Sequence, residues 1–229
     1  MNKTYQYLLF DADDTLFDFK ASEKEALNSF FQSLNIELTD SLRDHYHKIN
    51  HNLWAAFERG EITKEEILST RFRKLFKEEG IIVDHPTLEK DYQDRLASSH
   101  LTIPGVFEML DALKERYDLY IVSNGVASTQ YSRLKASGLY SYFKEIFISE
   151  ETGFQKPQIE FFEYVFQRIP AFDSSKAIII GDSLGSDIQG GVNAGIDTCW
   201  YNPKHLENTR KLPITYIVDS FDSILHFLL

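Results

Sequence analysis

Short apolar runs recur along this chain, and most of them end in small or polar residues. From about residue 101 onward these runs alternate with segments whose apolar residues recur at helical spacing. The predicted strands are Tyr7–Phe10, Asp118–Gly125, Glu145–Ser149, Ala177–Asp182, Ile196–Tyr201 and Ile214–Val218. Strands that alternate with helices favour right-handed crossovers and a parallel sheet covered on both faces. The pattern predicts an α/β fold with a doubly wound, Rossmann-like parallel sheet.

The long segment between the first two predicted strands has a different pattern. Its apolar residues recur at helical spacing, and no strand-like run interrupts it. Ser22–Glu25 and Thr63–Glu66 have the residue pattern of a capping box, and Gly60 and Gly80 suit helix ends. A fourth helical pattern follows Pro86. The segment therefore predicts four helices, and it is far longer than an ordinary crossover between strands.

These two patterns predict a sheet domain with an insertion. We assign residues 1–17 and 96–229 to a Rossmann-like core and residues 18–95 to an inserted helical cap domain. The insertion begins just after the carboxyl end of the first strand, where open α/β sheets bind their ligands. A helical domain hinged at that edge is expected to act as a lid.

Composition narrows the range of functions. The chain has 229 residues, of which 43% are hydrophobic, and a formal net charge of −11. That charge argues against binding to a nucleic-acid polymer or to an anionic membrane surface, because both need basic patches. Cys199 is the single cysteine and is expected to be an inert core residue. No apolar stretch is long enough to span a membrane or resembles a signal peptide, so we expect a cytoplasmic location.

Three carboxylates follow the first predicted strand within four residues, namely Asp11, Asp13 and Asp14. Uncompensated carboxylates at the edge of a core disfavour folding, and a bound cation would resolve this conflict. The segment therefore predicts a Mg²⁺ site that holds an acidic nucleophile. From this segment alone, a solvated turn with one Asp capping the next helix is an equal alternative.

The other predicted strand ends supply further polar groups. These are Ser123, Asn124, Lys156, Asp182 and Asp187. Together with the acidic segment they suit phosphoryl transfer, which needs a nucleophile, a cation, donors for the phosphoryl oxygens and an acid for the leaving group. Asp11 and Asp13 point the same way along an extended segment, so they suit a nucleophile and acid pair.

Four short motifs occur in a fixed order along the chain. They are Asp11-Ala12-Asp13-Asp14-Thr15, Ser123-Asn124-Gly125, Lys156-Pro157 and Gly181-Asp182-Ser183-Leu184-Gly185-Ser186-Asp187. In residues and order they resemble the motifs of the haloacid dehalogenase-like (HAD) hydrolase superfamily, and the insertion after the first motif resembles its helical cap. The sequence of residues 11–17 and 154–157 most resembles the motifs of the 5′-nucleotidase branch that acts on pyrimidine nucleoside monophosphates.

The resemblance implies a Mg²⁺-dependent phosphomonoester hydrolase that acts through an aspartyl-phosphate, on a nucleoside 5′-monophosphate. It implies that Asp11 is the nucleophile and that Asp13 protonates the leaving oxygen and then activates water. The remaining implied roles are phosphate binding by Ser123, Asn124 and Lys156, metal binding by Asp11, the backbone carbonyl of Asp13 and Asp182, and supporting positions for Thr15 and Asp187. Asp187 would support the metal through water or orient Lys156. Asp14 is expected to have a structural role.

Several alternatives stay open or are disfavoured. A sugar-phosphate phosphatase and a phosphomutase remain open, because substrate choice lies in the cap and loops. A 2-haloacid dehalogenase is disfavoured because that branch lacks an acid at the position of Asp13. A phospho-accepting signalling module is disfavoured because such domains are smaller and lack a cap insertion. We expect a small-molecule phosphomonoester as the partner, no nucleic-acid polymer, no membrane, and a monomer or weak dimer.

Some further residues have a plainer interpretation. His45, His47 and His51 fall near helical spacing, but no carboxylate or cysteine spacing completes a metal site with them. Trp54 and Phe57 are expected to lie in the seam between helices rather than in a base-stacking pocket. Pro157 is expected in the first turn of the helix that follows it.

Overall fold

A six-stranded sheet is the central element of the computed structural model, which describes residues 4–229. The expectation that the N-terminus is not a signal peptide involves residues 1–3, which lie outside the described part of the chain. The strands are β1 (Tyr7–Phe10), β2 (Asp118–Ser123), β3 (Glu145–Ile148), β4 (Ala177–Gly181), β5 (Asp197–Tyr201) and β6 (Tyr216–Val218). All neighbouring pairs are parallel, in the order β3-β2-β1-β4-β5-β6. This is the strand order of a Rossmann-type doubly wound sheet, so the predicted fold class is confirmed.

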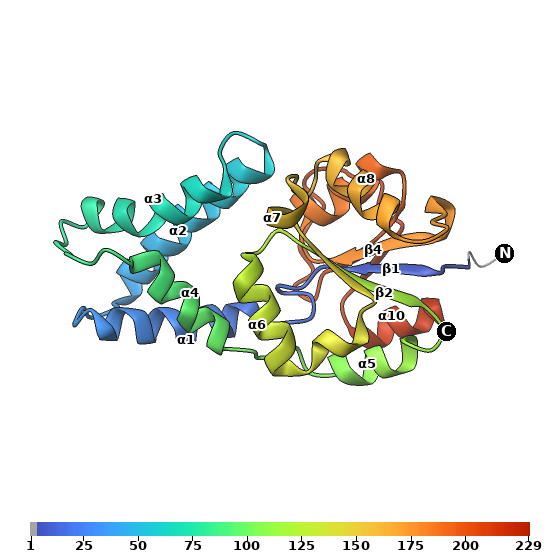
Figure 1. The fold of residues 1–229 in the computed structure, drawn as a ribbon, viewed down its shortest axis with the longest axis horizontal. Coiled ribbons are helices and arrows are strands. Elements are labelled where there is room, and N and C mark those ends of the chain that lie inside the picture. Colours follow the sequence, from blue (N-terminus) through green and yellow to red (C-terminus); the bar gives the residue numbers. More distant parts are fainter. Residues whose placement is uncertain (1–3) are drawn as a thin grey trace. The chain divides into compact units, whose positions relative to one another are not determined.

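Strand β1 lies in the middle of the sheet and is buried on both faces. Its residues alternate between two hydrophobic layers, as the period of a strand requires. Leu8 and Phe10 belong to the layer that contains the apolar residues of α5 (Val106–Leu113) and α10 (Phe221–Leu228). Tyr7 and Leu9 belong to the layer on the opposite face, beneath α8 (Ile159–Arg168). Figure 1 shows α5 and α10 on one side of the strands and α8 on the other.

Shorter elements complete the part of the chain that carries the sheet. Its remaining helices are α6 (Ala127–Ser137), α7 (Ser149–Thr152) and α9 (Gln189–Ala194). Single helical turns cover Leu139–Tyr142, Ser174–Lys176 and Leu184–Ile188. The register of β1 against β2 and β4 aligns Phe10 with Ile121 and Ile180. The three central strands therefore end close together, and their carboxyl ends form one edge.

The chain divides into two compact units. One contains the sheet and consists of the segments up to Phe19 and from His100 onward, and the other is Lys20–Ser99. The helices of the second unit are α1 (Phe19–Ser33), α2 (Asp40–Glu58), α3 (Lys64–Glu78) and α4 (Leu88–Ser98).

The helical unit has its own aromatic core. The ring of Phe72 in α3 lies 4.6 Å from Phe30 of α1, 5.2 Å from Tyr46 of α2 and 5.1 Å from Tyr92 of α4, measured between ring centroids. One side chain thus contacts a ring from each of the other three helices, and these rings form a core within the unit.

The predicted capping box at Ser22 is wrong. Helix α1 begins at Phe19, three residues earlier, so Ser22 lies inside the helix and is buried. Within the described residues its hydroxyl has no hydrogen-bond partner. The start of the helix is set by long-range pairing instead, because the backbone N–H of Asp18 donates to the carbonyl of Leu101.

The predicted place of Pro157 is also wrong, because α8 begins at Ile159 with Gln158 as its capping residue. The side chain of Asn124 binds both backbone groups of Lys156, accepting its N–H at 3.0 Å and donating to its carbonyl at 2.9 Å. The backbone N–H of Gln158 donates to the carbonyl of Gln155 at 2.8 Å, so Lys156 and Pro157 lie in a turn and the helix starts after the proline.

The capping box at Thr63 is confirmed and supports a prediction. The Thr63 hydroxyl accepts the N–H of Glu66 at 3.1 Å, and the Glu66 carboxylate accepts the N–H of Thr63 at 2.7 Å. Thr63→Ala is expected to lower the free energy of unfolding by about 1 kcal/mol, because it leaves a helix N–H without its partner. Urea denaturation of the full chain measures this. Thr70→Ala, which removes the same atoms from the middle of α3, should change stability by less than half as much.

Candidate active site

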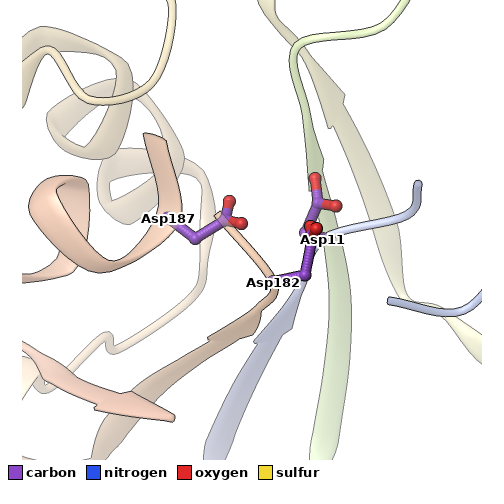
Figure 2. A group of neighbouring side chains, drawn as sticks. All are labelled: Asp11, Asp182 and Asp187. Carbon is purple, nitrogen blue, oxygen red and sulfur yellow. The ribbon is translucent and has the colours of Figure 1, made fainter. Parts of the chain in front are cut away.

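The carboxyl ends of β1, β2 and β4 carry the polar residues that the motifs predicted. Asp11 directly follows β1, Ser123 ends β2, and Asp182 directly follows β4. The backbone N–H of Asp11 donates to the carbonyl of Ile180 at 2.9 Å, which extends the pairing of β1 with β4 by one residue. Figure 2 shows Asp11 and Asp182 side by side at these strand ends, with Asp187 facing them from the helical turn after β4.

Lys156 is the central cation of this edge. Its ammonium group donates to Oδ1 of Asp11 at 2.7 Å, to Oδ1 of Asp187 at 2.6 Å and to the carbonyl of Val122 at 2.7 Å. All three donor positions of the ammonium are therefore used. The side chains of Lys156 and Asp187 are only 1% exposed, so these charge-assisted bonds lie away from water.

Burial and neighbouring charges shift the pKa values of Asp11 and Lys156. The pKa of Asp11 is raised to about 7, and removal from water is the largest cause of the rise. Lys156 opposes the rise, and the carboxylates of Asp187 and Asp13 add to it. Burial alone would lower the pKa of Lys156, but the facing carboxylates of Asp11 and Asp187 outweigh it and hold the pKa above its usual range. Lys156 is therefore a permanent cation beside a carboxyl group that is poorly solvated.

In protein stripped of metal with EDTA, ionisation of Asp11 should lower the free energy of unfolding as the pH rises toward 7. An exposed Asp has a pKa of about 3.9, so between that value and about 7 the folded chain binds more protons than the unfolded chain. The associated stability is fully present below the unfolded-state pKa and is lost as the pH rises through the folded-state pKa. Urea denaturation should show Asp11→Asn gaining stability relative to wild type across this window. A difference between the two proteins that is independent of pH would contradict the shift.

Three carboxylates could hold a cation here. One oxygen each of Asp11, Asp182 and Asp187 lies within 4.8 Å of the others, which is a spacing that a single ion can bridge. An all-oxygen donor set suits Mg²⁺, Mn²⁺ or Ca²⁺ rather than zinc or copper. Asp187 also accepts the N–H of Ser183 at 3.0 Å, so both of its oxygens already have protein donors. Within this group Asp187 therefore holds Lys156 and the backbone of Ser183.

The predicted phosphate-binding residues lie next to this group. The hydroxyl of Ser123 accepts the N–H of Gly125 at 3.0 Å and is 1% exposed. The side chain of Asn124 is engaged with the backbone of Lys156, as described above, so it positions the lysine. The hydroxyl of Thr15 is buried and, within residues 4–229, has no hydrogen-bond partner. Asp14 has a positive φ of 56°, which Asp tolerates better than most residues, and this fits a turn-forming role.

Two residues of the site were missed from the sequence. Arg133 donates to Oδ1 of Asp13 at 2.5 Å, and Gln130 donates to Oδ2 of Asp13 at 2.5 Å. Gln130 also donates to the Ser123 hydroxyl at 3.1 Å. The two residues are three apart in α6, which follows the Ser-Asn-Gly motif, so a polar pair on the buried face of that helix was the available signal.

Three of the residues with plainer interpretations, His45, Trp54 and Phe57, belong to the helical unit. His45 contacts Glu78 at 2.9 Å and Glu79 at 2.5 Å on the surface of the helical unit. The rings of Trp54 and Phe57 meet edge to face with centroids 5.6 Å apart. Cys199 is buried in β5, where burial raises the pKa of its thiol. Within the described residues, no helix is both long enough and apolar enough to cross a membrane.

Comparison with known proteins identifies the family of the chain. A model of the haloacid dehalogenase-like hydrolases matches residues 8–201. The chain is 48% identical to the putative HAD-hydrolase YfnB of Bacillus subtilis, over 99% of this chain and 96% of that protein. It is 44% identical to the pyrimidine 5′-nucleotidase PynA of Streptococcus pneumoniae, over 96% and 94%, and 31% identical to the pyrimidine 5′-nucleotidase YjjG of Escherichia coli, over 96% of each.

A solved structure agrees with these matches. The crystal structure of YfnB bound to magnesium superposes with a TM-score of 0.93 and covers 99% of both chains. Identity of this degree over nearly whole chains, together with the family model, confirms the resemblance that the four motifs carried. The chain belongs to the haloacid dehalogenase-like hydrolase family.

Proposed function

We propose that this protein is a Mg²⁺-dependent phosphatase that hydrolyses a pyrimidine nucleoside 5′-monophosphate through an aspartyl-phosphate on Asp11. The observation that carries the proposal is the buried Lys156, which binds Asp11 at 2.7 Å beside a second acid, Asp13, two residues further on. A nucleophile, a fixed cation and a proton donor are the groups that phosphoryl transfer needs. The names of PynA and YjjG, which match almost the whole chain, support the substrate class.

The chemistry has two steps. In the first, a carboxylate oxygen of Asp11 forms a bond to phosphorus, the bond from phosphorus to the ester oxygen breaks, and that oxygen takes a proton from the Asp13 carboxyl group. In the second, the Asp13 carboxylate takes a proton from water, the water oxygen bonds to phosphorus, and the bond from phosphorus to Asp11 breaks. The products are the alcohol and inorganic phosphate, and both aspartates return to their starting states.

The remaining site residues bind and orient. Lys156 would neutralise charge between Asp11 and the phosphoryl oxygens, and the Ser123 hydroxyl would donate to one of them. Asp187 would keep Lys156 in place. Asp11 and Asp182, with the backbone carbonyl of Asp13, would hold the metal. Magnesium bound there supplies a positive charge that polarises the phosphoryl group. The magnesium in the YfnB crystal structure supports this choice of ion.

The helical unit is proposed to act as a lid. The same YfnB structure is described as revealing interdomain movement, and the present chain has two compact units joined near Phe19 and His100. Closure of a lid would exclude bulk water from the phosphoryl group, and the lid residues would contact the part of the substrate that differs between esters. Substrate choice would then lie in the helical unit.

Phosphate release from a panel of phosphomonoesters tests the proposed function. The panel contains UMP, CMP and dTMP, the purine monophosphates AMP and GMP, and several sugar phosphates, each assayed with Mg²⁺ and with EDTA. The expected result is Mg²⁺-dependent release that is fastest with a pyrimidine monophosphate. Faster release from a sugar phosphate would instead assign a sugar-phosphate phosphatase, and isomerised substrate without release would assign a phosphomutase. No turnover of any ester would overturn the proposal.

Gly181→Ala is expected to disrupt the site by displacing the side chain of Asp187. A Cβ at Gly181 would lie 2.3 Å from Oδ2 and 2.4 Å from Cγ of Asp187, so the carboxylate that binds Lys156 would have to shift. We expect kcat/KM to fall about 10²-fold, as for a displacement of about 1 Å in an active site, and stability to fall by about 1–3 kcal/mol. Gly80→Ala is the matched control. It meets no atom within 4 Å, so it should lower stability through its positive φ alone and keep kcat/KM within about twofold.

A further inference from the structure

We infer that Gln130 and Arg133 are positioning residues that hold Asp13 for proton transfer. The inference rests on the proposed function and adds two residues that none of the four motifs contains. We call this pair the Asp13 clamp. Arg133 binds one oxygen of the Asp13 carboxylate and Gln130 binds the other, each at 2.5 Å. Two donors on the two oxygens fix the rotation of the carboxylate as well as its position.

Both donors are buried, and Arg133 also lies over an aromatic ring. Arg133 and Gln130 are 0% and 1% exposed, whereas the side chain of Asp13 is 27% exposed. The guanidinium of Arg133 lies 4.2 Å from the ring centroid of Phe17 and 5.7 Å from that of Phe19. A buried, stacked guanidinium has few alternative rotamers, so it presents its N–H groups in one direction. The partly exposed acid is thus bound on both of its oxygens by buried donors.

Gly125 provides the space that the clamp needs. A Cβ at Gly125 would lie 2.3 Å from Nε2 of Gln130 and within 2.9 Å of two further atoms of the same side chain. Gln130 therefore packs directly against the Ser-Asn-Gly motif and bridges its Ser123 hydroxyl to Asp13. The group proposed to bind phosphate and the group proposed to move protons are connected through one amide.

Stability alone is a weak explanation for this arrangement. A buried ion pair is frequently no more stabilising than apolar side chains of the same volume, because both charges must be removed from water. An apolar residue at position 133 would also pack against the ring of Phe17. The feature that an apolar residue would not reproduce is the orientation of the Asp13 carboxylate, which is the group that the proposed reaction uses twice.

Leaving-group dependence separates a positioning role from a structural one. An alkoxide needs a proton from Asp13 as the bond to phosphorus breaks, whereas 4-nitrophenolate leaves without one. Arg133→Met and Gln130→Met should therefore lower kcat/KM about 10²-fold for an alkyl ester such as UMP, the lower end of the range for general acid catalysis. For 4-nitrophenyl phosphate they should change kcat/KM by less than about fivefold. Because Asp13 also activates water, both variants should show a burst of nitrophenol.

The double mutants with Asp13→Asn complete the test. If the clamp acts through Asp13, Arg133→Met and Gln130→Met should change kcat/KM for UMP by less than about threefold once Asp13 is already Asn. Arg71→Met is the matched control, because Arg71 is likewise buried and paired to a carboxylate, Glu89, within the helical unit. It should lower stability and leave the ratio of alkyl to aryl ester rates unchanged. Gln130→Met is neutral and similar in volume, so it tests the clamp if Arg133→Met fails to fold.

The possible results distinguish the inference from the proposed function. If wild-type protein hydrolyses no ester, the proposed function fails. If wild type is active and Asp13→Asn selectively loses the alkyl ester, but the clamp variants lower both esters equally, the inference alone is overturned. It is also overturned if the clamp variants have the same effect with and without Asp13.

Discussion

Asp11→Asn is expected to lower Mg²⁺-dependent phosphate release by about 10⁵-fold or more, the scale seen when a covalent nucleophile is removed. The amide has the shape of the carboxylate but is a far weaker nucleophile. Oδ1 of Asp11 lies 2.7 Å from the ammonium of Lys156, and the amide oxygen of Asn keeps an acceptor at that position. The loss should therefore appear in kcat for every ester, aryl esters included, because no leaving group compensates for a missing nucleophile. The measurement is phosphate release at saturating substrate.

Two controls make this result specific. In EDTA at pH 7, Asp11→Asn should be at least as resistant to urea as wild type, because burial disfavours the charged form of Asp11 and raises its pKa to about 7. Asp14→Asn removes a carboxylate from the same loop at a position with a φ of 56°, which Asn tolerates, and should keep kcat within about threefold. Activity of Asp11→Asn above about 1% of wild type would assign the nucleophile elsewhere.

The sheet could be predicted because its central strands have a clear local sequence pattern. Tyr7–Phe10 and Ala177–Ile180 are uninterrupted apolar runs, which is the pattern of strands buried on both faces. The first is followed directly by Asp11 and the second by Gly181 and Asp182. In a doubly wound sheet such strands end at a common edge, so Asp11 and Asp182 were expected to meet. The structure brings them together with Lys156 and Asp187, while the chemical roles of these residues remain predictions.

The features that sequence reasoning missed depend on distant partners. Gln130 and Arg133 look like ordinary polar residues of an amphipathic helix, and only the fold shows that they bind Asp13, more than a hundred residues earlier. The start of α1 was misplaced for the same reason. Ser22 has the local signature of a cap, but pairing of Asp18 with Leu101 sets where the helix begins. Local patterns identify an element well and its boundary poorly when a long-range contact sets that boundary.

The place of Lys156 likewise depends on long-range contacts rather than on a local sequence pattern. A lysine before a proline has no local property that marks it as buried, and the resemblance to the family motifs supplied its role. The structure supplies the physical reason for its place, since Asn124 fixes its backbone and three oxygens surround its ammonium. The ammonium of Lys156 and the carboxylates of Asp11 and Asp187 therefore stabilise one another's charges.

Lys156→Met is expected to have the second largest effect, on stability as well as on activity. It removes the ammonium that Asp11 and Asp187 share, and leaves these two carboxylates close together in a site where the Asp187 side chain is 1% exposed. Breaking a buried ion pair by removing one partner typically lowers the free energy of unfolding by about 3–5 kcal/mol. The Val122 carbonyl also loses its donor. Urea denaturation in EDTA at pH 7 measures the loss. Phosphate release should fall at least about 10³-fold, because oriented charge on the phosphoryl group is lost.

Magnesium should partly restore the stability of Lys156→Met. A divalent ion that binds the folded carboxylates stabilises the folded state by mass action, and the variant has lost the internal cation that competes for Asp11. The increase in Tm on adding Mg²⁺ should therefore be larger for Lys156→Met than for wild type. Lys176→Met is the control, because the exposed Lys176 contacts Asp173 only at 3.6 Å and its loss should change stability by less than about 0.5 kcal/mol. If Lys156→Met were as stable as Lys176→Met in EDTA, or gained no more than wild type from Mg²⁺, then Lys156 would not be the cation that balances these carboxylates.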